Sequence, residues 1–131
     1  MTTAQKLGIG VLITGGLIGL LYLIAKAKEI EVYTDPEQVI NTTVNQEFII
    51  ALYSNPSTGY AWEESYDGNM LSLEKEEYIP KETLPGMVGV GGTQYYQFKV
   101  LKMGQTQITV TYKRPWETEY AEQKVFTVNI K

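Results

Sequence analysis

The chain has 131 residues, with 11 basic and 15 acidic side chains and a formal net charge of −4. It contains no cysteine and no histidine, which excludes disulfides, thiolate metal sites and any mechanism built on a Cys or His side chain. All 15 acids but only 8 basic residues lie from Glu29 onward, so this part carries a net charge of −7 and is poorly suited to nucleic acid. We therefore expect a binding protein rather than an enzyme, without a metal or cofactor.

The first predicted element is an N-terminal hydrophobic helix. Residues 7–25 contain no charge, and as a helix these 19 residues would span roughly 28 Å, close to the thickness of a bilayer core. We expect residues 1–28 to form a transmembrane anchor, giving a single-pass membrane protein with an extracytoplasmic domain. The alternative is a signal peptide cut after Ala25-Lys26-Ala27, which would release a secreted domain. Lysines on both flanks leave the membrane orientation open.

From residue 29 onward the pattern changes to period-two alternation, which is typical of β-strands. Phe48, Ile50 and Leu52, for example, share one face of a strand, which we expect to meet a core while the other face meets water. Many short strands without helices between them predict an all-β fold, an immunoglobulin-like β-sandwich of about 7–8 strands over residues 29–131. The predicted strands are 30–34, 39–44, 47–54, 60–66, 70–79, 93–102, 106–113 and 121–130.

Three loops between these strands carry unusual sequences: residues 55–60, residues 84–92 and residues 114–116. If successive strands run in opposite directions, all three loops fall at the same end of the sandwich. Loops on a rigid scaffold often carry binding function, so this end is the candidate site. The plain turns at Asn45-Gln46, Asp67-Gly68 and Met103-Gly104 would share the opposite end.

The first loop reads as a stiff turn. Pro56 fixes one φ angle, and Gly59 can adopt a positive φ that returns the chain to the next strand. Such a turn would present the backbone and hydroxyls of Ser57 and Thr58 outward, although this string alone is equally compatible with an ordinary hairpin turn.

The other two loops each allow two interpretations. The second is rich in glycine and would permit close backbone approach to a partner, but alone it is also typical of a mobile connector. The third places Trp116 beside Arg114, and both residue types are frequent in interface hot spots. Its alternative is a structural cation–π pair in which Arg114 stacks on Trp116. Apolar residues of the second loop that we expect to be exposed are Leu84, Met87, Val88 and Val90.

Together, the three strings resemble the chagasin family of cysteine-protease inhibitors, whose members carry Asn-Pro-Thr-Thr-Gly-Tyr/Phe, Gly-x-Gly-Gly and Arg-Pro-Trp/Phe loops on an immunoglobulin-like sandwich. The resemblance covers roughly residues 29–131, with Ser57 where the commonest form has Thr. It implies reversible inhibition of papain-like proteases, with Ser57 and Thr58 nearest the target's Cys–His pair. Separately, we expect the domain to be a monomer. The protease-binding residues that it implies are Asn55, Pro56, Ser57, Thr58, Gly59, Tyr60, Gly89, Val90, Gly91, Gly92, Arg114, Pro115 and Trp116.

Two other functions are compatible with the same features. One is a membrane-tethered immunoglobulin-like adhesion or assembly domain without a protease target. The other is an enzyme that uses carboxylates alone, although strand alternation makes a solvated face the simpler interpretation. If Asp35-Pro36 forms a turn, the domain begins at the end opposite the loops; if the chain runs straight, it begins at the loop end. The carboxylates in question are Glu63, Glu64, Glu74, Glu76 and Glu77.

Overall fold

The computed structural model describes residues 30–82, 85 and 90–131. In this part of the chain, eight strands confirm the all-β prediction, and each lies within two residues of its predicted bounds. One short 3-10 turn, η1 (Pro56–Thr58), lies between the third and fourth strands. The strands are β1 (Glu31–Tyr33), β2 (Ile40–Thr42), β3 (Glu47–Ser54), β4 (Ala61–Ser65), β5 (Leu71–Pro80), β6 (Gly92–Val100), β7 (Gly104–Lys113) and β8 (Glu122–Ile130).

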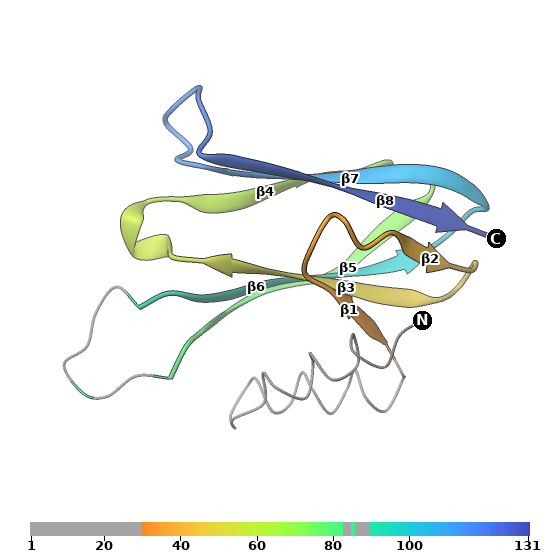
Figure 1. The fold of residues 1–131 in the computed structure, drawn as a ribbon, viewed down its shortest axis with the longest axis horizontal. Coiled ribbons are helices and arrows are strands. Elements are labelled where there is room, and N and C mark those ends of the chain that lie inside the picture. Colours follow the sequence, from red (N-terminus) through yellow and green to blue (C-terminus); the bar gives the residue numbers. More distant parts are fainter. Residues whose placement is uncertain (1–29, 83–84, 86–89) are drawn as a thin grey trace.

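The strands form two four-stranded sheets that pack as a β-sandwich (Figure 1). The first sheet has the order β1-β3-β6-β5 and the second the order β2-β8-β7-β4. Both sheets are mixed, because β1 pairs parallel to β3 and β2 pairs parallel to β8, while the remaining neighbours are antiparallel. Every one of these pairings agrees with strands that alternate in direction along the chain, which is the assumption behind the prediction of a shared loop end.

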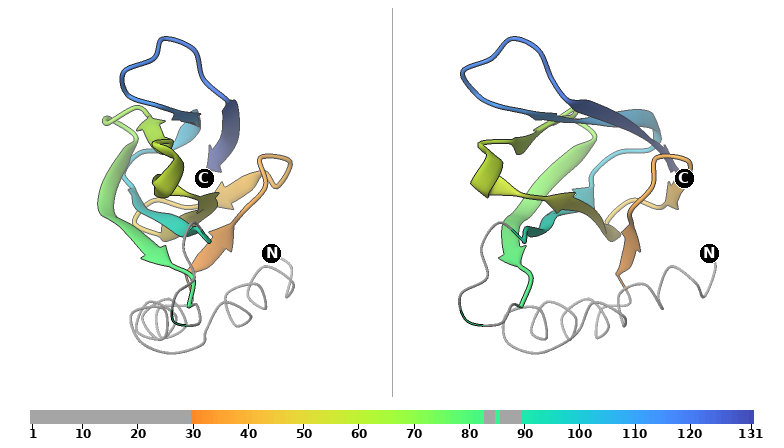
Figure 2. Two further views of the ribbon diagram at one scale, coloured as in Figure 1. Left: turned by 90° about the vertical axis from the view of Figure 1, so that its left-hand side faces the viewer. Right: turned by 60° about the vertical axis from the view of Figure 1, so that its left-hand side comes forward.

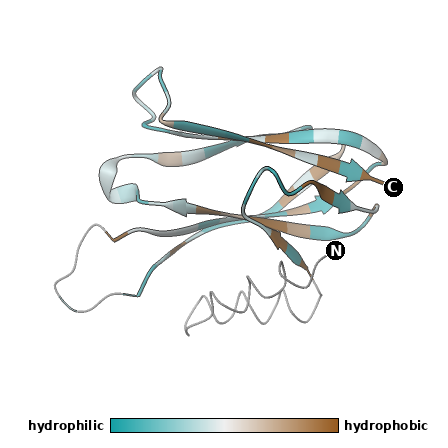
Figure 3. Ribbon diagram, viewed as in Figure 1, coloured by the Kyte–Doolittle hydropathy of each residue, from teal (hydrophilic) through white to brown (hydrophobic). Residues whose placement is uncertain are grey.

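The main core lies between the two sheets and is built from the buried apolar side chains of both. Figure 3 shows hydrophobic positions along the strands of both sheets. Phe48, Ile50 and Leu52 are buried there as the alternation predicts. The two sheets are also joined by a hydrogen bond, since the Tyr96 hydroxyl of β6 donates to the carbonyl of Trp62 in β4 at 3.1 Å. Burial is the main cause that raises the pKa of Tyr96, and the negative charge of nearby glutamates adds to it. The hydroxyl therefore keeps its proton and remains a donor.

The prediction that the other face of β3 meets water is wrong. Ile49 and Ala51 are 1% and 4% exposed and belong to a second buried cluster on the opposite face of the first sheet. β3 is an interior strand of that sheet, between β1 and β6, and its neighbours contribute further apolar side chains to this outer face. The remaining members of the cluster are Ile30, Val32, Ile79 and Tyr95.

The β3–β4, β5–β6 and β7–β8 connections all leave the sandwich at one end, as predicted (Figure 2 turns this end toward the viewer). The chain enters at the opposite end, because Glu31 pairs with Phe48 near the start of β3 and the two strands are parallel. A turn after β1 is closed by the Gln38 N–H, which donates to the Asp35 carbonyl at 2.9 Å. Of the two alternatives at Asp35-Pro36, the turn is the one present, and the domain begins far from the loops.

The expected hydrophobic helix within residues 1–28 lies outside the described residues. Within the described ranges, the structure contains no helix with the length and apolar character needed to cross a membrane.

Candidate functional site: three loops at one end of the sandwich

The first loop is braced by its own side chains. The Thr58 hydroxyl donates to the Asn55 carbonyl at 2.7 Å, and the Ser57 hydroxyl donates to the Asn55 side-chain oxygen at 2.6 Å. The backbone N–H of Thr58 donates to the same Asn55 carbonyl at 3.2 Å, which forms the turn of η1. These hydrogen bonds link the loop to itself, so the Ser57 and Thr58 hydroxyls that were expected to point outward hold its shape instead.

Gly59 ends the 3-10 turn in the left-handed region, with φ 86° and its N–H donating to the Pro56 carbonyl at 2.9 Å. A side chain is disfavoured here for two reasons. L-residues rarely adopt this backbone conformation, and a Cβ would lie 2.8 Å from Cη2 of Trp116. The ring of Trp116 therefore rests directly against the first loop, while the residue stays 71% exposed.

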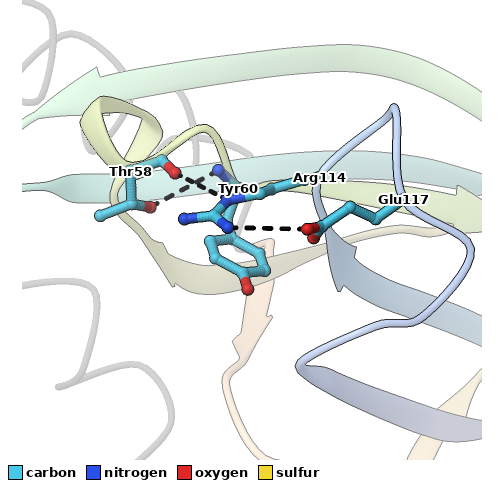
Figure 4. Close-up of polar contacts among 4 residues, drawn as sticks. All are labelled: Thr58, Tyr60, Arg114 and Glu117. Carbon is cyan, nitrogen blue, oxygen red and sulfur yellow. Dashed lines mark hydrogen bonds and ion pairs between the residues drawn. The ribbon is translucent and has the colours of Figure 1, made fainter.

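Arg114 connects the third loop to the first (Figure 4). Its Nε donates to the Thr58 carbonyl at 3.1 Å, and its guanidinium carbon lies 4.5 Å from the centre of the Tyr60 ring. Its Nη1 also forms an ion pair with Glu117 at 3.7 Å. The cation–π contact in this structure is thus made with Tyr60 of the first loop, not with Trp116 as the alternative interpretation held.

Tyr112, at the end of β7, supports the first loop from below. Its hydroxyl accepts a hydrogen bond from the Asn55 N–H at 2.9 Å. Its ring stacks on Tyr60 at 5.3 Å and packs against Trp62 at 4.8 Å between centroids. The Trp62 indole N–H in turn donates to the Tyr53 carbonyl at 2.8 Å. The rings of Trp62 in β4 and Tyr112 in β7 therefore form a base beneath the first loop, and the Tyr53 carbonyl ties that base to β3.

The second loop meets the first sheet through two glycines without room for side chains. Gly91 has φ 79°, and a Cβ on it would lie 2.8 Å from both the Tyr53 hydroxyl and the Ser54 carbonyl. At Gly92 a Cβ would lie 2.2 Å from the Ile79 carbonyl, so only glycine fits beside β5. The Lys81 N–H closes the base of the loop by donating to the Gly91 carbonyl at 2.9 Å.

Five further positions of the second loop were named in the sequence analysis, and the structure describes one of them, Val90. Val90 is partly exposed, and the others lie outside the described residues. Those others are Leu84, Met87, Val88 and Gly89.

The carboxylates considered for catalysis lie on the strands β4 and β5 and not in the three loops. Burial, followed by the negative charge of Glu64, raises the pKa of Glu76. Nothing else in the described ranges suggests catalytic chemistry at these residues, and those ranges hold no group of three acids that could bind a metal.

Sequence reasoning missed the residues that hold the loops in place. Tyr112 lies within the predicted strand 106–113, and its position near the end of a strand that leads into Arg114-Pro115-Trp116 is a usable signal. Glu117 follows Arg114 by three residues, a spacing that permits the observed ion pair. The exposed Tyr53 beside Gly91 carried no comparable signal.

Comparison with known proteins identifies the family of this chain. The family model described as chagasin family peptidase inhibitor I42 matches residues 41–130. Amoebiasin-2 of Entamoeba histolytica is 37% identical over 90 residues, which cover 67% of this chain and 73% of that protein. Chagasin of Trypanosoma cruzi is 34% identical over 88 residues, which cover 63% of this chain and 77% of that protein.

Solved structures give the same result. The crystal structure of a cysteine protease inhibitor from Entamoeba histolytica is similar with a TM-score of 0.66 and 33% identity, covering 78% of this chain and 96% of that one. The structure of Leishmania mexicana ICP has a TM-score of 0.54 and 28% identity, covering 76% of this chain and 90% of that one. With the family model spanning most of the described sandwich, the chain belongs to the chagasin family of peptidase inhibitors.

Proposed function

We propose that this chain is a reversible inhibitor of papain-like cysteine proteases and that its three loops bind in and around the target's active-site cleft. The observation that carries the proposal is the joined edge of the sandwich. Arg114 of the third loop holds Thr58 and Tyr60 of the first, and the second loop leaves the same end. Relatives at 33–37% identity include a protein described as a cysteine protease inhibitor, which supports this target class.

In this proposal each loop has its own place. Residues 55–60 enter the cleft, with Ser57 and Thr58 nearest the protease's Cys–His pair. Residues 89–92 run along one side, and residues 114–116 lie along the other with the exposed Trp116 as an anchor. The absence of Cys and His in the chain is no obstacle, because the reactive groups belong to the protease.

The braced first loop explains how such an inhibitor avoids being cleaved. Attack on a peptide bond requires the carbonyl to approach the nucleophile in a narrow range of geometries. The hydrogen bonds from Ser57 and Thr58 to Asn55 hold the loop in a 3-10 turn, and Arg114 fixes the Thr58 carbonyl. A loop fixed in this way also loses little conformational entropy on binding, which favours tight association.

Inhibition can be measured directly. The full chain, kept soluble in a mild detergent, is titrated into papain or a cathepsin-like protease while hydrolysis of a fluorogenic peptide is followed. We expect activity to fall with increasing inhibitor and to return on dilution. Full protease activity at micromolar concentrations of the chain would reject the proposal.

We also propose that residues 7–25 anchor the domain in a membrane. The support is the length of this uncharged segment, roughly 28 Å as a helix. Because the domain begins at the end opposite the loops, an anchor there would leave the three loops directed away from the bilayer. Retention in the membrane fraction after alkaline extraction tests the anchor, and a mature chain that begins near residue 28 would show cleavage and secretion instead.

The sandwich itself is assigned, as part of this proposal, to the immunoglobulin-like class. Its size of about a hundred residues and its two packed sheets match that architecture. The parallel pairs β1–β3 and β2–β8 are departures from the purely antiparallel sheets of that class.

A further inference from the structure

A groove of about 530 Å³ lies beside the third loop, lined by Tyr60, Trp116 and residues 117–121. Tyr60 and Trp116 belong to the proposed protease-binding edge, so the groove continues that edge beyond the Arg-Pro-Trp motif. The segment is held at both ends: the Glu117 N–H donates to the Arg114 carbonyl at 3.0 Å, and the Ala121 N–H donates to the Tyr112 carbonyl at 2.8 Å. The groove therefore has a fixed frame.

The side chains of the groove combine a carboxylate with exposed aromatic rings. Trp116 is 71% exposed and Tyr120 is 54% exposed, and both line the groove with the exposed Glu119. Glu117 is already paired with Arg114. Glu119, by contrast, forms no ion pair with any described residue. Its negative charge is therefore available to a partner.

A carboxylate beside exposed aromatic rings is suited to a cation. Lysine and arginine side chains are attracted to the faces of Trp and Tyr rings, and their N–H groups form charge-assisted hydrogen bonds with carboxylates. The net charge of −7 from residue 29 onward favours a basic partner surface in the same way. Neither an anion nor a purely apolar side chain would form a favourable ion pair with the carboxylate.

We propose that this groove binds a lysine or arginine side chain on the rim of the target protease, beside the third loop, with Glu119 as the ion-pair partner and Tyr120 as an aromatic wall. This inference rests on the proposed inhibitory function. It adds a feature of the target that the three loop motifs do not specify, a basic residue on the rim beside the third loop. Proteases with a basic residue at that side of the cleft are then bound more tightly than those without one.

The test compares variants of the full chain in detergent against one papain-like protease that the wild type inhibits. We expect Glu119→Gln to raise the inhibition constant about two- to fivefold at low salt, with a smaller difference at high salt because the lost contact is an exposed ion pair. Tyr120→Ala should raise it by about two- to fivefold, while Tyr120→Phe, which keeps the ring face, stays near wild type. Glu37→Gln, on the turn between β1 and β2, is the matched control for loss of an exposed carboxylate.

The outcomes separate the two proposals. If the wild type inhibits and Glu119→Gln behaves like Glu37→Gln at both salt concentrations, the groove does not bind a cation, although the inhibitor function stands. If only Tyr120→Ala weakens inhibition, the groove binds an apolar side chain and this inference is wrong. A wild-type chain that inhibits no papain-like protease removes both proposals together.

Discussion

Substitution of Gly59 is expected to damage both the first loop and its contact with Trp116. An L-residue at φ 86° costs about 1–2 kcal/mol relative to glycine. An alanine Cβ would also lie 2.8 Å from Trp116 Cη2 and 3.4 Å from its Cζ2, so the indole ring must move. Gly59→Ala should therefore lower the free energy of unfolding by about 1–2 kcal/mol, and lower Tm by about 4–8 °C per kcal/mol.

Inhibition should suffer more than stability, because the displaced Trp116 is a proposed anchor. Truncation of such aromatic anchors costs more than about 1 kcal/mol, so we expect the inhibition constant of Gly59→Ala to rise about fivefold or more. Gly68→Ala is the matched control, since a Cβ at Gly68 meets nothing within 4 Å and its φ is not positive. Thermal unfolding and inhibition titrations of the two variants give the comparison. A Gly59→Ala chain with a lower Tm but an unchanged inhibition constant would refute the role of Trp116, and no change in either would refute the strain.

Three further changes test the supports of the loop end. Arg114→Lys keeps the charge but loses the fixed Nε donor and the planar stack on Tyr60, so inhibition should weaken by about 1–2 kcal/mol in the same titration. Tyr112→Phe removes the acceptor for the Asn55 N–H and should reduce the free energy of unfolding by about 0.5–1.5 kcal/mol in denaturant melts. The pKa of Glu76 is raised in the folded chain, so ionising it opposes folding, and this penalty develops as the pH rises from the unfolded pKa through the folded one. Glu76→Gln should therefore raise Tm slightly at neutral pH but not at pH values below the unfolded pKa, and an equal effect at both would contradict the shift.

The sequence was sufficient to predict the strands because their signal is local. Alternation such as that of Phe48, Ile50 and Leu52 places one face of a strand on the core regardless of what lies elsewhere in the chain. Strand direction then follows from counting turns, which is why the shared loop end could be predicted without knowing the sheet order. The outer face of β3 could not be predicted in this way, because its burial depends on apolar neighbours contributed by β1, β5 and β6.

The site was predicted as a set of residues but not as a set of contacts. The ring on which Arg114 stacks depends on how the first and third loops meet. Trp116 is the aromatic residue nearest to Arg114 in the sequence, but the fold brings the Tyr60 ring against the guanidinium. The direction of the Ser57 and Thr58 hydroxyls depends on the 3-10 turn, in which both hydroxyls donate hydrogen bonds to Asn55. Contacts between distant segments are decided by side-chain direction, which spacing alone does not encode.

The central claim is that the three loops occupy the active-site cleft of a papain-like protease, and binding to a blocked enzyme tests it most directly. The full chain is titrated against the free protease and against the same protease whose cleft is filled by a covalent active-site-directed inhibitor. Our account predicts reversible one-to-one binding to the free enzyme and its loss when the cleft is filled. Equal binding to both forms would contradict it.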